Sequence, residues 1–176
     1  ERLTALVNGL LLLAQADAGE VIVAQDALDL SELAEEASLL YEPLAEERGL
    51  AFLWECAPGV SVAGDAQRLR RLVTNLLDNA MKFTPSGGSV RLDVRRDGGD
   101  AVLSVADTGV GVAPVHLPHI FERFYRADPA RVSSGSGLGL SICRWIVEAH
   151  GGAITAESRD HGGTTFIVRI PMRSPS

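Results

Sequence analysis

One amphipathic helix constrains the fold of this chain more than any other feature. In the segment 65–83, apolar residues recur at steps of three and four, which predicts a buried helical stripe; they are Leu69, Leu72, Val73, Leu76 and Ala80. Asn75, Asn79 and Lys82 recur at the same steps on a second stripe, about 120° around the axis at about 100° per residue. Asparagine is unfavourable inside a helix because its amide competes for backbone groups. Two amides and an amine on one face can bind a metal ion and phosphate oxygens.

Lys82 also stands out in the composition. The chain has 16 basic residues, of which 15 are arginine and one is lysine. A lysine ammonium is a compact charge that suits phosphate oxygens, so its presence here favours a phosphate site, with chance in the composition as the alternative.

Length and charge limit the class of protein. With 176 residues, 46% of them hydrophobic, the chain can bury the core of one domain with a short appendage. A net charge of −7 argues against a nucleic-acid binder. Cys56 and Cys143 have no His or Cys at ligand spacing, which argues against a zinc site or disulfide framework and fits a reducing cytoplasm. The apolar run 10–14 is far shorter than the ~20 residues needed to span a bilayer.

The remaining helices and strands fall into separate groups. Residues 1–17 place leucines at heptad-like steps, which predicts the tail of a helical hairpin or, alternatively, a helix packed on this same domain. The segment 21–30 is a linker with room for a short strand, and Ser31 is placed to begin a helix that ends near Gly49. Strands are predicted at 50–56, 60–63, 89–95, 101–106, 153–158 and 164–170, and another helix between 137 and 150. This order favours an α+β two-layer sandwich over a doubly wound parallel fold.

Two glycine motifs flank a long loop. Asp107-Thr108-Gly109-Val110-Gly111 follows a strand; a plain turn is one interpretation, and the other is an Asp that accepts a hydrogen bond from a base amine. The segment 113–136 has no sustained period, and loops of this length are usually functional. Gly135-x-Gly137-x-Gly139 precedes a helix and can present backbone amides to an anion, without the pattern of a dinucleotide fingerprint or a P-loop.

Taken together and in this order, the motifs resemble the catalytic and ATP-binding domain of bacterial sensor histidine kinases, of the GHKL (Bergerat-fold) superfamily. They are the Asn75, Asn79 and Lys82 helix, Asp107-x-Gly109-x-Gly111, Phe121-Glu122-Arg123-Phe124-Tyr125-Arg126, Gly137-Leu138-Gly139-Leu140 and Gly163-Thr164-Thr165-Phe166. The resemblance implies an α+β, two-layer α/β sandwich, with a mixed sheet of about five strands packed on three helices. It also implies this division of the chain: second dimerisation-hairpin helix 1–19, linker 20–29, catalytic domain 30–171 with an ATP lid at about 113–136, and a disordered tail 172–176.

The resemblance implies a role for each motif residue. ATP and Mg²⁺ would bind between the helices and a mobile lid, with Mg²⁺ held by Asn79 and Asn75 and phosphate oxygens by Lys82. Asp107 would accept the adenine amine. The others would line the site: Gly109, Gly111, Val112 and Thr164 around adenine, Phe83 beside the nucleotide, Gly137, Leu138 and Gly139 around the triphosphate, and Arg126 and Arg123 near the terminal phosphate.

The implied activity is that of a protein-histidine kinase. The γ-phosphate would pass to a histidine on the dimerisation domain and then to a response regulator. The intact protein would be a homodimer anchored in the cell membrane, this domain lying in the cytoplasm without contact to membrane or nucleic acid. No histidine of this chain stands in a His-Glu/Asp-x-x-x-Pro setting, so the acceptor is expected outside it; the four are His116, His119, His150 and His161.

Two other functions remain open from the sequence. A GHKL-type ATPase would need a Glu base four residues before the metal-binding Asn79, where Asn75 stands. An anti-sigma-like protein or degenerate kinase domain would act as a binding module, which the intact site motifs and the leading helix argue against.

Overall fold

A computed structural model describes residues 7, 9–11, 14, 24–127, 137–158 and 162–172. Its elements are β1 (Asp26–Asp29), α2 (Leu30–Glu47), β2 (Ala51–Cys56), β3 (Ser61–Gly64), α3 (Ala66–Phe83), β4 (Ser89–Asp97), β5 (Asp100–Asp107), the 3₁₀ helix η1 (Leu117–His119), α4 (Gly139–Ala149), β6 (Ala153–Ser158) and β7 (Thr164–Pro171).

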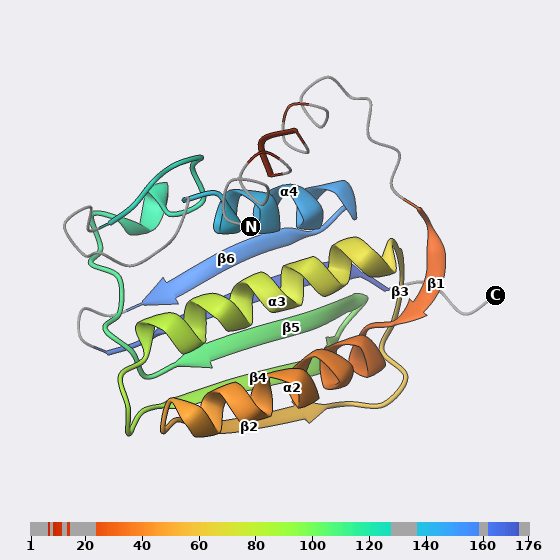
Figure 1. The fold of residues 1–176 in the computed structure, drawn as a ribbon. Coiled ribbons are helices and arrows are strands. Elements are labelled where there is room, and N and C mark those ends of the chain that lie inside the picture. Colours follow the sequence, from red (N-terminus) through yellow and green to blue (C-terminus); the bar gives the residue numbers. More distant parts are fainter. Residues whose placement is uncertain are drawn as a thin grey trace.

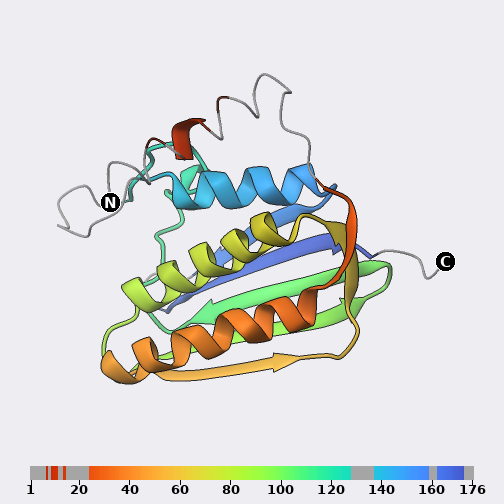
Figure 2. The same cartoon turned by 45° about the vertical axis from the view of Figure 1, so that its right-hand side comes forward.

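The described elements form two layers. Five strands make one sheet in the order β2-β4-β5-β7-β6, and α2, α3 and α4 lie side by side on one of its faces (Figure 1). The view in Figure 2 shows the same three helices on one side of the sheet. The sheet is mixed, because β2 runs parallel to β4 whereas the other neighbours are antiparallel. The predicted α+β sandwich with a mixed five-stranded sheet is therefore confirmed.

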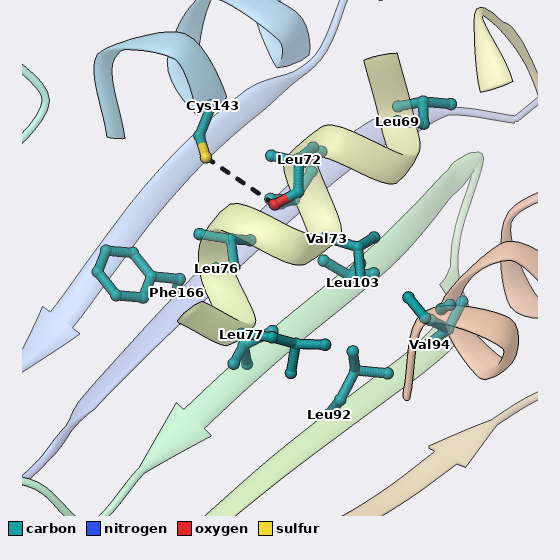
Figure 3. Close-up of a cluster of buried hydrophobic side chains, with 14 of the residues drawn as sticks. Leu69, Leu72, Val73, Leu76, Leu77, Leu92, Val94, Leu103, Cys143 and Phe166 are labelled. Atoms are coloured by element: carbon teal, nitrogen blue, oxygen red, sulfur yellow. Dashed lines mark hydrogen bonds between the residues drawn. The ribbon is translucent and has the colours of Figure 1, made fainter. Parts of the chain in front are cut away.

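Helix α3 lies at the centre of the core. It begins after Asp65, whose carboxylate accepts from the Arg68 N–H at 3.1 Å, and it ends at Thr84, directly before Pro85. The predicted apolar stripe is fully buried, and Leu77 and Met81 join it. Figure 3 shows Val73 and Leu77 of α3 beside Leu103 and Leu92 of the sheet. Burying each leucine contributes about 1.5–3 kcal/mol, so this contact fixes α3, and the polar stripe with it, over the sheet.

The segment predicted as a linker is joined to the domain by a strand. β1 pairs antiparallel with β3 in a separate two-stranded sheet, and the Leu30 N–H donates to the Val60 carbonyl at 2.9 Å. The prediction that Ser31 begins the next helix was wrong, because the N-cap lies two residues earlier and Ser31 is the second residue of α2. Asp29 is the N-cap, since its carboxylate accepts from the backbone of Ser31 and Glu32. The Ser31 hydroxyl instead donates to the Ala57 carbonyl.

The two ends of the chain are described only in part. Most of the helix predicted over 1–17 lies outside the described residues; Gly9 is helical and buried, and a Cβ there would lie 3.3 Å from Ile142 of α4. Met172, which the sequence assigns to the tail, donates its N–H to the Gly99 carbonyl, and 173–176 lie outside the description. No helix in the described part is both long and apolar enough to cross a bilayer.

The candidate nucleotide site

Three neighbouring strands meet at one edge of the sheet. β5 ends at Asp107, β6 ends at Ser158, and β7 begins at Thr164. The register places Ser158 opposite Thr164, and Ala106 opposite Thr165. Asp107, Ser158 and Thr164 therefore come together on adjacent strands. The C-terminal end of α3 and the start of α4 lie over the same edge (Figure 1). Residues far apart in the sequence are thereby gathered around one place.

Asp107 is held by backbone amides. Its Oδ1 accepts from the Gly109 N–H at 2.8 Å and from the Thr164 N–H at 3.3 Å. Within the described residues these are its hydrogen bonds, which leaves Oδ2 for another donor. Burial raises the pKa of the Asp107 carboxyl, and the two backbone hydrogen bonds oppose that rise. A fixed, half-buried acceptor of this kind can recognise an amine.

Glycine is required at two positions around this carboxylate. A Cβ at Gly163, whose φ is +84°, would collide with the Asp107 carbonyl, and a Cβ at Gly109 would collide with the Phe83 carbonyl. The Val110 N–H donates to the same Phe83 oxygen at 3.2 Å, which joins the loop to the end of α3. The sequence motifs include both glycines, whereas the close approach of each one to a backbone carbonyl is visible only in the fold.

The C-terminal half of α3 carries the polar stripe. Asn75, Asn79 and Lys82 are all half-buried. The Asn75 amide Nδ2 donates to the Gly139 carbonyl at a long 3.4 Å, which connects α3 to the first turn of α4. Burial, together with the nearby charge of Arg126, lowers the pKa of Lys82. Two cations near each other, one of them half-buried, favour a polyanion between them.

The family model for histidine kinase-, DNA gyrase B- and HSP90-like ATPases matches residues 64–174, which include the whole edge just described. The chain belongs to this family. It is 36% identical over 173 residues to the sensor protein SrrB of Staphylococcus aureus (strain NCTC 8325 / PS 47), covering 97% of this chain and 30% of the relative. The chain thus spans about a third of the length of the curated relatives it matches.

Solved histidine kinases share the fold. Full-length ShkA in complex with AMPPNP matches with a TM-score of 0.86 at 34% identity, over 99% of this chain and 36% of that one. The mycobacterial sensor histidine kinase MprB matches with a TM-score of 0.74 at 33% identity, over 86% of this chain and 100% of that one. ThkA in complex with the response regulator TrrA matches with a TM-score of 0.77 at 25% identity, over 97% of this chain and 48% of that one. The resemblance read from the motifs, to the ATP-binding catalytic domain of sensor histidine kinases, is confirmed.

Part of the predicted lid of this histidine-kinase domain is described. Residues 113–127 are described and include η1, whereas 128–136 lie outside the description. The Phe124 N–H donates to the Gly137 carbonyl at 2.9 Å, so the backbone on the two sides of the segment 125–136 meets there. Phe124 has a φ of +63° and Gly137 a φ of +70°. A non-glycine residue in this region is uncommon and marks a constrained backbone.

The two arginines assigned to the terminal phosphate lie in different surroundings. Arg126 is exposed and close enough to Lys82 to affect its pKa. Arg123 lines a hollow on the outer side of α4, together with Arg144 and Trp145. The fold therefore brings Arg126 near Lys82 of the polar stripe.

The donor set on α3 fits a magnesium ion held jointly with phosphate. The described residues contain no cluster of three or more His, Cys, Asp or Glu side chains that could hold a metal. Amide oxygens of Asn79 and Asn75 are hard donors, and Mg²⁺ in nucleotide sites typically takes few protein ligands besides phosphates and waters. Because Asn75 points its nitrogen at Gly139, its oxygen is the atom left for such a contact.

Sequence reasoning missed Ser158. Its Oγ accepts from the Val112 N–H at 2.7 Å and lies 2.8 Å from the Gly163 carbonyl and 3.1 Å from the Thr164 Oγ1. The signal in the sequence is weak, because a serine at the end of a predicted strand is ordinary. Only the pairing of β6 with β7 places it beside Thr164.

Proposed function

We propose that this domain binds Mg·ATP at the edge formed by Asp107, Thr164 and the polar stripe of α3, and passes the γ-phosphate to a histidine on the dimerisation domain of the intact protein. The observation that carries the proposal is the Asp107 carboxylate. Its Oδ1 is occupied by two backbone amides and its Oδ2 remains for the adenine amine. AMPPNP in the complex of the similar ShkA supports a nucleotide at this fold.

Each residue of the proposed site has a distinct role in binding ATP or magnesium. Asp107 selects the adenine amine; Gly109, Gly111 and Val112 let the base approach the loop, and Phe83 lies beside it. Lys82 and Arg126 neutralise phosphate oxygens, because phosphoryl transfer is helped by cations placed around the phosphates. Asn79 and Asn75 would hold the magnesium ion, which supplies charge neutralisation on the phosphates when bound. Gly137, Leu138 and Gly139 would present backbone amides to the triphosphate at the start of α4.

Transfer to a histidine is favoured over hydrolysis by the chemistry of Asn75. An ATPase of this superfamily would need a general base there to activate water, and a carboxamide has no titratable proton to exchange near neutral pH. The Asn75 amide is moreover turned toward the Gly139 carbonyl. The position four residues before Asn79 therefore supplies no general base for water.

The partners follow from the relatives. We infer that the intact protein is a dimeric, membrane-anchored sensor whose cytoplasmic part includes this domain, and that its phosphohistidine serves a response regulator. SrrB is a sensor protein, and ThkA has been solved with the response regulator TrrA, which supports this inference.

Phosphoryl transfer tests the proposal directly. The 176-residue chain is incubated with [γ-³²P]ATP and Mg²⁺, alone and with the separately produced dimerisation domain of the intact protein. We expect no label on the chain alone and acid-labile label on the dimerisation domain when both are present. Steady release of phosphate by the chain alone would instead indicate an ATPase, and binding of ATP with no transfer to the dimerisation domain would indicate a binding module.

A further inference from the structure

The hydroxyl of Ser158 joins three backbone segments around the site. It lies within hydrogen-bond distance of the loop after β5 at Val112, of the turn before β7 at Gly163, and of the first side chain of β7, Thr164. Ser158 itself is the last residue of β6 and is half-buried. No residue of the sequence motifs plays this part.

The protons of these contacts can be assigned by counting. A serine hydroxyl has one proton to donate and two lone pairs to accept with. The Val112 N–H can only donate, so it occupies one Ser158 lone pair. The Gly163 carbonyl can only accept, so at 2.8 Å it takes the Ser158 proton. The contact to Thr164 then uses the second lone pair of Ser158, and the proton in it comes from Thr164.

This assignment fixes what Thr164 offers to a ligand. Its hydroxyl proton is committed to Ser158, so the Thr164 oxygen presents only lone pairs on its other side. The Thr164 N–H is committed to Asp107 Oδ1. Asp107 Oδ2 is also an acceptor. The two side-chain oxygens at this edge are therefore both acceptors, which suits an exocyclic amine and opposes a carbonyl in the same place.

We propose that Ser158 is a positioning residue that sets base specificity, by holding the Thr164 hydroxyl so that the pocket accepts the 6-amine of adenine and rejects a 6-carbonyl. The proposal rests on the proposed function, since it concerns the base end of the same nucleotide site. It goes further in naming the residue that orients Thr164 and the chemical group, a purine 6-carbonyl, against which the pocket discriminates.

Inosine triphosphate is the sharpest probe, because it differs from ATP in having a carbonyl at position 6 and a proton on N1. Dissociation constants for both nucleotides are measured by calorimetry on the wild-type chain and on Ser158→Ala. Removing the serine frees the Thr164 hydroxyl to rotate and donate to the carbonyl. We expect the ratio of the inosine triphosphate constant to the ATP constant to fall by about 2- to 10-fold, the range of one neutral hydrogen bond.

A structural loosening would weaken both nucleotides alike and leave that ratio unchanged, so the ratio isolates the proposed role. Ser158→Thr keeps the hydroxyl and should restore the wild-type ratio. Ser104→Ala makes the same chemical change on the outer sheet face and should leave it unaltered. In a Thr164→Val background, adding Ser158→Ala should no longer change the ratio, because the hydroxyl through which Ser158 acts is gone.

The outcomes separate the two proposals. A wild-type chain that binds neither nucleotide would contradict the proposed function itself. A wild-type chain that prefers ATP, combined with a ratio that stays within 2-fold in Ser158→Ala, would overturn the role of Ser158 and leave ATP binding intact. A ratio that falls equally with and without the Thr164 hydroxyl would overturn it as well.

Discussion

Replacing Asp107 with asparagine should separate stability from nucleotide binding. The Asn Oδ1 can accept the same two backbone N–H groups from Gly109 and Thr164. The group that changes is Oδ2, which becomes an NH₂ facing the adenine amine, also a donor. The variant loses a charge-assisted hydrogen bond, worth about 1.5–3 kcal/mol, and leaves donors unpaired at a cost of about 1–3 kcal/mol. We expect ATP to bind about 10²- to 10⁴-fold more weakly, since about 1.4 kcal/mol is tenfold.

The same substitution should stabilise the nucleotide-free fold. Burial raises the pKa of Asp107 above its unfolded value, so ionisation of this carboxylate opposes folding. The stability associated with its protonated form is present below the unfolded pKa and is lost as the pH rises through the folded pKa. At neutral pH the wild type bears the full free-energy cost of burying the ionised Asp107 carboxylate, and Asp107→Asn removes that cost. A gain of about 1 kcal/mol would raise the Tm by about 2–4 °C, and this difference should shrink on acidification.

Thermal unfolding between pH 4 and 8, with and without ATP, measures both effects. Asp97→Asn is the matched control, because Arg169 lowers the pKa of that exposed carboxyl and its removal should neither stabilise the fold nor change ATP affinity. ATP binding by Asp107→Asn within 3-fold of the wild type, or a Tm difference that widens as the pH falls, would refute the reasoning.

Three further variants test other parts of the site. Gly163→Ala should destabilise the domain by about 3 kcal/mol or more in urea unfolding, because its Cβ meets the Asp107 carbonyl. Gly98→Ala is the control: its φ is +60° but the space around it is open, so it should cost about 1 kcal/mol. Equal losses in the two variants would contradict the close approach at Gly163. Asn79→Ala should weaken ATP binding by calorimetry in Mg²⁺ and have little effect in a chelator, and an equal loss in both would count against metal ligation. Lys82→Met should weaken ATP at least 10-fold and leave adenosine unchanged, and a parallel loss for adenosine would show that Lys82 supports the fold instead of the phosphates.

The sequence predicted most of the fold because its strongest signals were local. The apolar period of the segment 65–83 predicted helix α3, and the structure has this helix at Ala66–Phe83. The start of α2 was misplaced because Asp29 and Ser31 are both good caps, and the choice depends on the Ala57 carbonyl, which lies 26 residues away and binds the Ser31 hydroxyl. Competition of this kind is decided by tertiary contacts that no local pattern contains.

The residues of the candidate site also fall into two groups, those that the sequence could identify and those that only the fold reveals. Residues that are rare in their local setting, such as the asparagines on α3 and the Asp-x-Gly-x-Gly loop, could be chosen from the sequence. Ser158 could not, because its importance comes from the order β5-β7-β6, which places the end of one strand beside the start of another.

The two faces of α3 also explain why changes to the site need not unfold the domain. The apolar stripe of this helix supplies the core contacts of Leu72, Leu76 and Leu77, whereas Asn75, Asn79 and Lys82 are only half-buried. A substitution on the polar stripe removes less buried apolar surface than one in the core, so its effect on the free energy of unfolding is small compared with the about 2–5 kcal/mol expected for a core leucine changed to alanine. The Asn75 contact to the Gly139 carbonyl differs from the rest of the stripe in that it connects α3 to α4. Variants at Asn75 should therefore combine a loss of nucleotide affinity with a loosened α3–α4 contact, whereas variants at Asn79 should affect affinity alone.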